Sequence, residues 1–369
     1  MLSNRERLIL LNLIPDVGSI RLRRLLDAFG DLDRVWTAGP GELQQAEGVG
    51  PVLAQRIIAA RHDEQRLTQE LALATRHGVM IVTLEDDEYP ESLKTIPDPP
   101  LALYIRGSVI EADRIAVAIV GARHASLYGL QCAEQLGHDL ALRGVTVISG
   151  LARGIDGAAH RGALKASGRT LAVLGSGLAC LYPPEHETLA VQVAEHGAVI
   201  SEYPMEMRPL PHNFPRRNRV ISGFSLGVVI VEAGQRSGAL ITADMALEQG
   251  REVFAVPGPM TSVTSQGTHQ LLKQGARLVT SVEDILEELR LAPQPAVQTQ
   301  RSGRSAETVP LLEFEQRVLS CLSEEPRDID AVAAQTGLGM PEVSSLLLQL
   351  ELKHVARQLP GKQFVRKAL

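Results

Sequence analysis

The chain has 369 residues, of which 44% are hydrophobic and 3% aromatic, and its formal net charge at pH 7 is −6. This length is enough for two or three domains, and the composition predicts a sizeable core built from aliphatic side chains. The negative balance excludes a protein coated in positive charge, so any nucleic-acid site must be a local groove.

Cysteine usage and hydropathy indicate the compartment. Cys132, Cys180 and Cys321 lie far apart and share no metal-binding or redox spacing, so we expect reduced, inert thiols. No apolar run approaches membrane-spanning length, and the first apolar run is too short for a signal peptide and carries charge within it. We therefore expect a soluble, cytoplasmic protein that does not bind a membrane.

Residues 1–62 predict a small helical domain. Two glycine hairpins, in IPDVGSIRLRRLL from Ile14 and AEGVGPVLAQRII from Ala46, each precede apolar residues at helical spacing. Pro51 fits the first position of the second helix, where its missing N–H costs little. The pattern resembles paired helix-hairpin-helix motifs of a SAM-like domain, which hold a DNA phosphate on backbone amides without reading bases. A helical packing domain without DNA contact is the alternative, because the charges of this segment nearly balance.

Residues 63–290 predict an α/β domain. A helix is expected over Asp63–His77, followed by strands at Met80–Leu84 and Leu101–Gly107. Apolar runs and helical stretches then alternate regularly up to a last helix near Val282–Leu289, which is typical of a parallel sheet covered by helices. The further strands are expected at Ile115–Val120, Val145–Ser149, Thr170–Leu174, Ala198–Ser201, Gly227–Val231 and Glu252–Val256.

Two glycine turns follow consecutive strands of this domain, AIVGARHAS from Ala118 and VISGLARGIDGAAH from Val147. Each leads into a helix and contains an arginine, Arg123 or Arg153. Turns of this kind lie at the carboxyl ends of strands, where open α/β sheets bind ligands. Glycine lets backbone N–H groups approach an anion, a helix N-terminus adds partial positive charge, and arginine adds a forked donor. We interpret the pair as a phosphate-binding site; tight turns with solvated arginines are the alternative.

A second cluster stands in PLPHNFPRRNR, which ends at Arg219. The flanking prolines predict an exposed loop. On such a loop the ring of Phe214 could stack on an unpaired base, while Arg216, Arg217 and Asn218 hold the backbone or base edges. The alternatives are a core position for Phe214 and a structural role for Arg219.

A third strand-to-helix turn, around Gly234, is expected to line the same crevice. Asp156 is expected to cap the helix that follows its turn by accepting backbone N–H bonds. The candidate DNA-binding residues are Gly121, Arg123, Ser126, Ser149, Gly150, Arg153, Gly154, Phe214, Arg216, Arg217, Asn218, Gly234, Ser237 and Gly238.

Residues 291–310 are rich in Pro, Gln, Ser and Thr and predict a flexible linker. Residues 311–369 predict two helices, a turn, a third helix and a hairpin, a pattern that resembles a winged helix. The third helix usually reads bases in such folds, but it contains no Lys or Arg from Pro341 to Leu352. This does not favour a major-groove contact over one through the wing or with a protein. The positive charge lies later, at Lys353, Arg357, Lys362, Arg366 and Lys367.

Stretches covering most of residues 80–290 resemble, in order, the DprA family, also called Smf, the DNA-processing proteins of bacterial natural transformation. They are IVGARHASLYG from Ile119, VISGLARGIDGAAHRGAL from Val147, VLGSGLACLYPPEH from Val173, ISEYP from Ile200, FPRRNRVISG from Phe214, VVIVEAGQRSGALITA from Val228 and EQGREVFAVPG from Glu248.

The resemblance implies an extended Rossmann-like domain, flanked by the helical and winged-helix domains, which vary in this family. It implies a homodimer that binds single-stranded DNA and delivers RecA recombinase to that strand, and a binding protein rather than an enzyme. We expect the dimer to form through Glu252–Leu289, because this segment is rich in Ile, Leu and Val beside the last predicted strand, whose edge would otherwise stay unpaired.

Enzymatic alternatives use the same kind of sheet. A dinucleotide-dependent oxidoreductase would use Gly175 and Gly177, but Cys180 stands where the third glycine of the fingerprint belongs. The acid that would hold the ribose, Glu202, also comes later than the fingerprint expects.

A nucleotide phosphoribohydrolase of the LOG kind would carry PGGxGTxxE. The related turn here is EAGQRSGALITA, and the closing Glu would fall near Ile241 or Thr242, where no carboxylate stands to act as a general catalyst. A nuclease would need clustered metal ligands, whereas the carboxylates of this domain are scattered. We therefore expect no catalytic residue, no cofactor and no metal site. The scattered carboxylates are Asp156, Glu202, Glu232 and Asp244.

Overall fold

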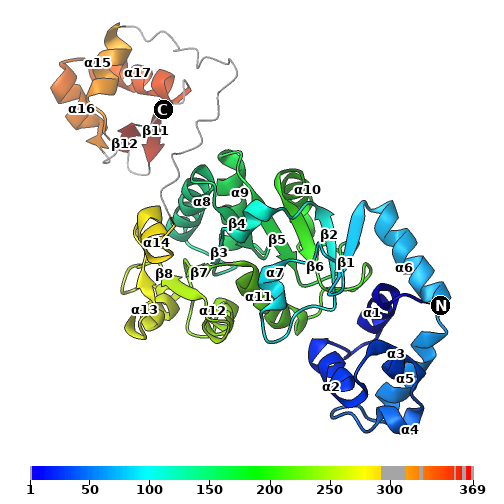
Figure 1. Cartoon of the computed structure of the whole chain (residues 1–369). Helices are drawn as coiled ribbons and strands as arrows, with labels where there is room; N and C mark the ends of the chain where they lie inside the picture. The colour runs from blue at the N-terminus through cyan, green and yellow to red at the C-terminus, as the bar shows by residue number, and fades with distance from the viewer. Residues whose placement is uncertain (1, 292–312, 324–326, 353–354, 360–362, 367–369) are drawn as a thin grey trace. The chain divides into compact units, whose positions relative to one another are not determined.

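The computed structural model describes residues 2–291, 313–323, 327–352, 355–359 and 363–366. The chain forms two compact units, Met1–Val297 and Gln298–Leu369 (Figure 1). Nearly all of the predicted linker lies outside the described residues, and so do Lys353, Lys362 and Lys367 of the predicted wing.

The first unit begins with short helices, as the hairpin patterns predict. Pro51 occupies the first turn of its helix, as expected. The apolar faces of the helices meet in a core that includes Leu8, Leu25 and Ile57. Ile9 belongs instead to a cluster that contains residues of the sheet, so this helical segment packs directly on the α/β part. The helices are α1 (Asn4–Leu13), α2 (Ser19–Phe29), α3 (Leu32–Thr37), α4 (Pro40–Leu43), α5 (Pro51–Arg61) and α6 (Glu64–Arg76).

In the described part of the first unit, nine strands form one sheet in the order β1-β2-β6-β5-β4-β3-β7-β8-β9. The pairs β1–β2 and β2–β6 are antiparallel, and the remaining pairs are parallel. Every predicted strand is confirmed, with bounds that agree within one residue. The strands are β1 (Val79–Thr83), β2 (Ala102–Gly107), β3 (Ala116–Val120), β4 (Thr146–Ser149), β5 (Thr170–Leu174), β6 (Ala198–Ser201), β7 (Gly227–Ile230), β8 (Glu252–Ala255) and β9 (Arg277–Leu278).

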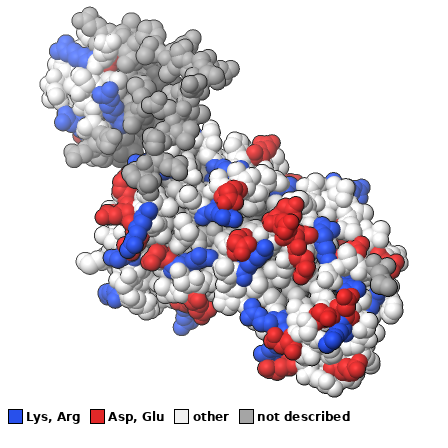
Figure 2. Space-filling model, in the orientation of Figure 1, with Lys and Arg blue, Asp and Glu red and all other residues white. Residues whose placement is uncertain are grey.

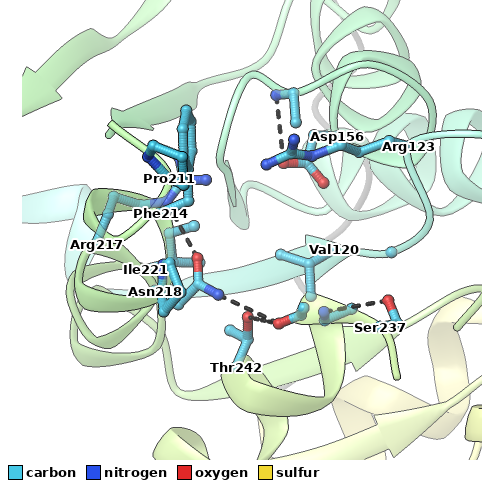
Figure 3. A pocket seen from close by; sticks show the side chains of 15 residues that line it. Val120, Arg123, Asp156, Pro211, Phe214, Arg217, Asn218, Ile221, Ser237 and Thr242 are labelled. Carbon is cyan, nitrogen blue, oxygen red and sulfur yellow. Dashed lines mark hydrogen bonds between the residues drawn. The ribbon is translucent and has the colours of Figure 1, made fainter. Parts of the chain in front are cut away.

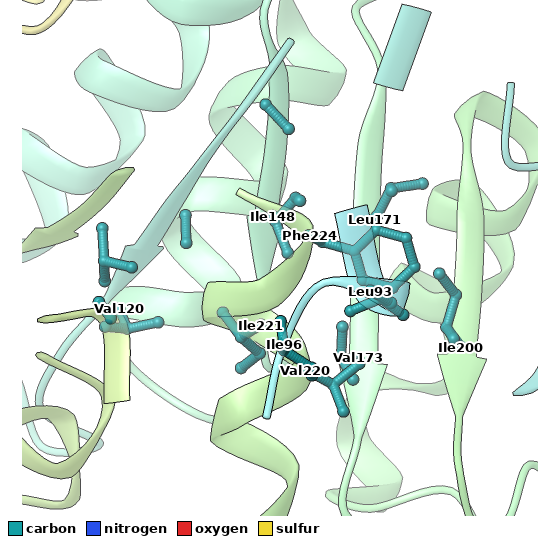
Figure 4. Close-up of a cluster of buried hydrophobic side chains, with 14 of the residues drawn as sticks. Leu93, Ile96, Val120, Ile148, Leu171, Val173, Ile200, Val220, Ile221 and Phe224 are labelled. Atoms are coloured by element: carbon teal, nitrogen blue, oxygen red, sulfur yellow. The ribbon is translucent and has the colours of Figure 1, made fainter. Parts of the chain in front are cut away.

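Helices cover both faces of the sheet (Figure 1). On one face, Leu93, Val220 and Phe224 pack against Ile148 and Leu171 (Figure 4). Successive residues of a strand point to opposite faces, and the other face packs against its own set of helices. The first face carries α7 (Glu91–Lys94), α11 (Asn213–Phe224), α12 (Gly238–Glu248) and α13 (Gln266–Lys273). The second face carries α8 (Leu127–Leu142), α9 (Ile155–Lys165), α10 (Glu187–His196) and α14 (Val282–Glu288), besides α1 and α6.

The strand order reverses at β3. The chain continues from β3 to β4 on one side, whereas β7 lies on the other side of β3 and continues to β8. The helices that follow, α8 and α12, therefore cover opposite faces of the sheet. Between the loops that diverge here, open α/β sheets form a crevice at the carboxyl ends of the strands, where they bind ligands. The topology confirms the extended Rossmann-like fold and places a crevice beside the two glycine turns.

The second unit confirms the predicted winged helix. Its described helices pack around a core that includes Val318, Val332, Val343 and Phe364. Gly337 ends the second helix with a φ of 68°, a conformation that favours glycine. The helices are α15 (Glu313–Ser320), α16 (Ile329–Thr336) and α17 (Met340–Leu352), and the antiparallel strands are β10 (Arg327–Asp328), β11 (Ala356–Leu359) and β12 (Gln363–Arg366).

The length and hydropathy of the helices bear on membrane insertion, because a spanning helix needs about 20 mostly apolar residues. Across the ranges described above, each helix is too short or too polar to cross a membrane.

Candidate functional site

The crevice contains a pocket of about 370 Å³, within the range of small-ligand sites. Arg123 and Asp156 lie on one side of it, and Phe214 and Asn218 lie on the other, as Figure 3 shows. The start of α12, with Ser237, forms a further part of the wall. The pocket therefore unites the glycine turns after β3 and β4, helix α11 and the turn after β7.

The two glycine turns are in direct contact. Gly154 has a φ of 74°, and a Cβ on this residue would lie 2.3 Å from the carbonyl oxygen of Ala122. A Cβ on Gly121 would lie 2.7 Å from the side chain of Ile155. Only glycine fits at either position. The close approach of the two turns brings Arg123 and Arg153 together in the lining of a small notch beside the main pocket.

Arg123 presents an available positive charge. Its side chain is exposed and forms no ion pair with any residue that the structure describes. The guanidinium carbon lies 5.0 Å from the centre of the Phe214 ring, a cation–π distance. The arginine is therefore held at the pocket by a ring rather than by a carboxylate, so its N–H groups can bind an anion.

Phe214 does not lie on an exposed loop, and that prediction is wrong. It stands in the first turn of α11 and is half-buried. Proline is tolerated in the first turn of a helix, where N–H groups lack intrahelical partners, so Pro215 marks the start of a helix here. The ring packs closely on the turn after β5, because a Cβ on Gly175 would lie 2.9 Å from it.

A second aromatic residue was not predicted. Tyr182 meets Phe214 edge-on, with ring centroids 5.9 Å apart and an interplanar angle of 61°. The guanidinium carbon of Arg153 lies 5.7 Å from the centre of the Tyr182 ring. Tyr182 precedes two prolines in the sequence, as in the proline-flanked pattern that singled out Phe214, so the same signal could have found it.

Arg153 differs from Arg123 because it is already paired. Its Nε donates to the carboxylate of Glu185, and its Nη1 lies 3.4 Å from the hydroxyl of Tyr182. The hydrogen bond between the two charged groups raises the pKa of Arg153 and lowers the pKa of Glu185. An anion that bound Arg153 would have to compete with this carboxylate.

Arg217 is buried, in contrast to the predicted exposed cluster. Its Nη1 donates to the carbonyl oxygen of Gly150 at 2.8 Å and also to that of Val173. These carbonyls lie at the carboxyl ends of β4 and β5, so the arginine ties α11 to the sheet. Desolvation lowers the pKa of Arg217 to about 10, and the nearby carboxylate of Asp156 opposes the shift. The side chain lines the pocket, but its guanidinium is occupied by these carbonyls.

The helix also separates the neighbours of Arg217. The Nδ2 of Asn218 donates to the carbonyl oxygen of Gly238 at 3.3 Å, which joins α11 to the start of α12. Arg216 is exposed and lines a different pocket, beside Gly18. Successive residues of an α-helix are rotated by about 100°, so Arg216 points away from the pocket that Arg217 and Asn218 line together.

The two serines of the prediction have structural partners. Ser149 is buried, and its hydroxyl donates to the carbonyl oxygen of Ile119 at 2.6 Å. Ser126 caps α8 by accepting from the N–H of Gly129, and its hydroxyl donates to the buried carboxylate of Glu232 at 2.6 Å. Glu232, which sequence reasoning did not assign, therefore holds the start of α8 against the end of β7.

Asp156 stabilises the glycine turn rather than the helix. It lies inside α9, and its Oδ2 accepts from the N–H groups of Gly150 at 3.2 Å and Ala152 at 3.3 Å, both before the helix. The predicted helix cap is therefore wrong. Burial raises the pKa of the Asp156 carboxyl, and Arg217 opposes this shift. The amide of Gly150 is occupied by this carboxylate.

The turn after β7 contributes to the pocket as predicted. Ser237 and Gly238 line it, and Ser237 caps α12 by accepting from the N–H of Ala239 at 3.3 Å. Gly234 lies on the same turn outside the pocket lining, beside the backbone of Val263. The start of α12 adds partial positive charge to the wall.

The distribution of charged side chains on the surface also bears on where DNA could bind. Basic and acidic side chains are interspersed over the face of the first unit that Figure 2 shows. This distribution fits a local anion site better than a broad basic face.

The residues that the enzymatic alternatives would use make structural contacts or lack the required acid. A Cβ on Gly177 would lie 2.0 Å from the carbonyl oxygen of Pro204, so this glycine serves packing. Glu202 pairs with Arg219 at 2.5 Å, and Arg219 also pairs with Asp98 at 3.0 Å, which confirms the structural role suggested for this arginine. Thr242 lines the pocket at the place where a phosphoribohydrolase would need an acid. In the described ranges, no three His, Cys, Asp or Glu side chains gather to hold a metal ion.

Similarity to known proteins was found along most of the chain. Residues 80–290 match the family described as DNA recombination-mediator protein A, and residues 303–362 match the DprA winged helix domain. Protein Smf of Escherichia coli (strain K12) is 39% identical over 355 residues, which cover 93% of each chain. DNA processing protein DprA of Bacillus subtilis (strain 168) is 42% identical over 261 residues, which cover 69% of this chain and 88% of the relative.

Two solved structures of DNA processing protein A are also similar to this chain. DNA processing protein A (DprA) from Streptococcus pneumoniae superposes with a TM-score of 0.67 at 33% identity, covering 78% of this chain and 99% of the other. DNA processing protein A from Helicobacter pylori, whose structure is described for its single-stranded DNA binding mode, has a TM-score of 0.52 at 29% identity. The match covers 57% of this chain and 96% of the other.

Proposed function

The chain belongs to the DNA recombination-mediator protein A family, also called DprA or Smf, and we propose that it binds single-stranded DNA in the crevice at β3 and β7. The observation that carries the proposal is the position of the Arg123 cation, which has no ion-pair partner among the described residues, over the Phe214 ring beside a pocket at the carboxyl ends of the strands. In this role the protein would handle incoming strands during natural transformation.

The chemistry of the pocket supports a single strand over a duplex. Proteins hold single strands with cations along the backbone and aromatic rings on which bases stack. Arg123 offers the phosphate contact, and Phe214 with Tyr182 offers aromatic surface. The base faces of a duplex are hidden by stacking, so the ring contacts would be lost there. The single-stranded DNA binding mode described for the Helicobacter pylori relative supports the same assignment.

We also propose that the protein acts by binding and not by catalysis. The pocket carboxylate, Asp156, already accepts two backbone N–H groups, and Arg217 holds the surrounding carbonyls. Neither group is placed to attack a bound nucleotide. On the family resemblance, the bound strand would then be delivered to RecA, which adds the mediator role.

The edge of the sheet supports a homodimer. The strand β9 is the last of the sheet, and its Leu278 is 52% exposed. An unpaired edge with an exposed apolar side chain is prone to pair with another chain. We propose that two copies meet along the segment Glu252–Leu289 that contains this edge.

Fluorescence anisotropy with a labelled oligothymidylate and a matched duplex tests the binding proposal. We expect tighter binding of the single strand and a steep loss of affinity with salt, because phosphate contacts release counterions. A parallel assay follows hydrolysis of nucleoside monophosphates. Hydrolysis without strand binding would overturn the proposal in favour of a phosphoribohydrolase. Delivery of RecA is tested separately, by whether the protein stimulates the RecA ATPase on strands precoated with single-strand binding protein.

A further inference from the structure

The ion pair between Arg153 and Glu185 lies at the crevice, and the fold does not depend on it. It links the turn after β4 to a short 3₁₀ turn, η2 (Pro184–His186), and both side chains are about half exposed, 46% and 47%. Exposed ion pairs contribute little to stability. The pair therefore calls for a role at the site itself.

The arginine is positioned independently of its acid. The guanidinium of Arg153 lies over the Tyr182 ring, 5.7 Å from its centre, and Nη1 is 3.4 Å from the tyrosine hydroxyl. Tyr182 is fixed in turn by its edge-on contact with Phe214. Loss of Glu185 would thus leave the guanidinium at the same place with two of its contacts.

The location continues the main pocket. A small notch is lined by Arg123, Gly150, Arg153, Tyr182 and Phe214, of which Arg123 and Phe214 also line the main pocket. A strand with one base on Phe214 and one phosphate on Arg123 would carry its neighbouring nucleotide to this notch. There the nearest cation is Arg153, which Glu185 occupies.

We propose that Arg153 and Tyr182 form a second nucleotide subsite, in which Glu185 takes the place of the phosphate until a strand displaces it. The inference rests on the proposed binding of single-stranded DNA. Carboxylate and phosphate oxygens accept the same forked hydrogen bonds from a guanidinium. A phosphate can therefore replace the Glu185 carboxylate on Arg153 without loss of hydrogen bonds.

Competition from Glu185 lowers the affinity of Arg153 for a phosphate. It also makes Arg153 select the phosphate of a bound strand over a free anion. A free anion would have to displace Glu185 unaided, whereas the phosphate of a strand is already held nearby by the contacts at Arg123 and Phe214. The strand also leaves more easily, since Glu185 can take Arg153 back. Such a device suits a protein that must pass its strand on.

The test is a double-mutant cycle with Glu185→Gln and Arg153→Ala, read by anisotropy with oligothymidylate. We expect Glu185→Gln to tighten binding about three- to tenfold at low salt, because a phosphate then binds Arg153 without first displacing a carboxylate. The slope of log K against log salt should steepen by up to about 0.7, because Arg153 then neutralises a phosphate without giving up its partner carboxylate. On the Arg153→Ala background, Glu185→Gln should have little effect.

Glu187→Gln is the matched control, because it removes the same charge from an exposed acid two residues away that the structure does not pair with Arg153. Melting temperatures of all variants report folding. If Glu187→Gln tightens binding as much as Glu185→Gln, or if the gain persists without Arg153, the inference is overturned and Glu185 acts only through the general field. If the unmodified protein does not bind the strand, or Arg123→Ala leaves binding unchanged, the proposed function itself fails.

Discussion

Arg123 and Phe214 approach the crevice from different elements, and the guanidinium carbon of Arg123 lies 5.0 Å from the centre of the Phe214 ring. The arginine comes from the glycine turn after β3, and the ring comes from the first turn of α11. The contact joins a phosphate donor to a stacking surface. Mutations can separate these two contributions, because phosphates are present in every nucleic acid whereas open base faces are present only in single strands.

Arg123→Ala should weaken binding of single-stranded DNA about tenfold to a hundredfold, because charge-assisted hydrogen bonds contribute roughly 1.5–3 kcal/mol. The salt dependence should become shallower by about 0.7 in slope. Arg114→Ala is the control, since Arg114 is exposed and pairs with Glu111 just before the amino end of β3, away from the crevice. Equal affinities for the two variants, measured by anisotropy over a salt series, would remove Arg123 from the site.

Phe214→Ala should weaken single-strand binding by roughly five- to a hundredfold, since stacking is worth about 1–3 kcal/mol per base. Weak duplex binding, which depends on phosphates, should change little. Phe214→Tyr keeps an aromatic ring and should retain most of the affinity. The ring is half-buried, so melting curves accompany the titrations. A folded Phe214→Ala variant that binds single strands as before would contradict stacking at this position.

The sheet and the crevice could be predicted from the sequence because they depend on local patterns. Short apolar runs between glycine turns define buried parallel strands, and the bounds of the observed strands agree with these runs. The requirement for glycine at Gly121 and Gly154 also follows from close packing. The strand β9 was missed because two residues are too few for a periodic signal.

The side-chain roles were harder to predict because they depend on contacts between distant segments. Prolines around Phe214 were interpreted as a loop, although proline also starts helices. Once α11 is a helix, Arg217 turns inward to the carbonyl of Gly150 while Arg216 turns outward. Nothing in the local sequence distinguishes an arginine that binds carbonyls from one that binds phosphates.

Gly150→Ala should destabilise the protein, because a Cβ on Gly150 would lie 2.6 Å from the guanidinium nitrogens of the buried Arg217. Overpacking of this kind costs about 1–3 kcal/mol. Gly238→Ala is the matched control, since nothing lies within 4 Å of a Cβ there. Urea denaturation of both variants measures the difference. An unchanged midpoint for Gly150→Ala would show that Arg217 can move away at no cost.

Leu278→Asp should convert the proposed dimer into a monomer, because it places a charge on the exposed edge strand β9. Light scattering at micromolar concentration measures the mass directly. Ile20→Asp serves as the control, since Ile20 is 52% exposed like Leu278 but lies in α2, outside the proposed interface segment. A monomeric unmodified protein, or a dimer that survives Leu278→Asp, would count against this interface.

His160 in α9 is fully buried, and its ring Nδ1 lies 2.7 Å from the Oγ1 of Thr170. The Thr170 hydroxyl donates its own hydrogen to the carbonyl oxygen of Val147 at 2.8 Å. The hydroxyl must therefore accept from His160, so Nδ1 carries a hydrogen. The other ring nitrogen, Nε2, is buried and has no hydrogen-bond partner among the residues that the structure describes.

Desolvation lowers the pKa of His160 to about 3, whereas a histidine in an unfolded chain titrates near 6.5. Between these two pH values the unfolded chain binds a proton that the folded protein does not. The contribution of His160 to stability is thus complete above pH 6.5 and is lost progressively as the pH falls toward 3. From pH 7 to pH 5 the free energy of unfolding should decrease by about 2 kcal/mol through this residue.

His160→Gln tests the linkage, because glutamine can still donate to Thr170 but does not titrate. The variant should be less stable at pH 7, since its shape differs, but its urea midpoint should change less between pH 7 and pH 5 than that of the unmodified protein. The other histidines contribute equally to both proteins and cancel in the comparison. Equal pH dependence in the two proteins would mean that His160 is protonated at no cost in the folded state, against the lowered pKa that its burial causes.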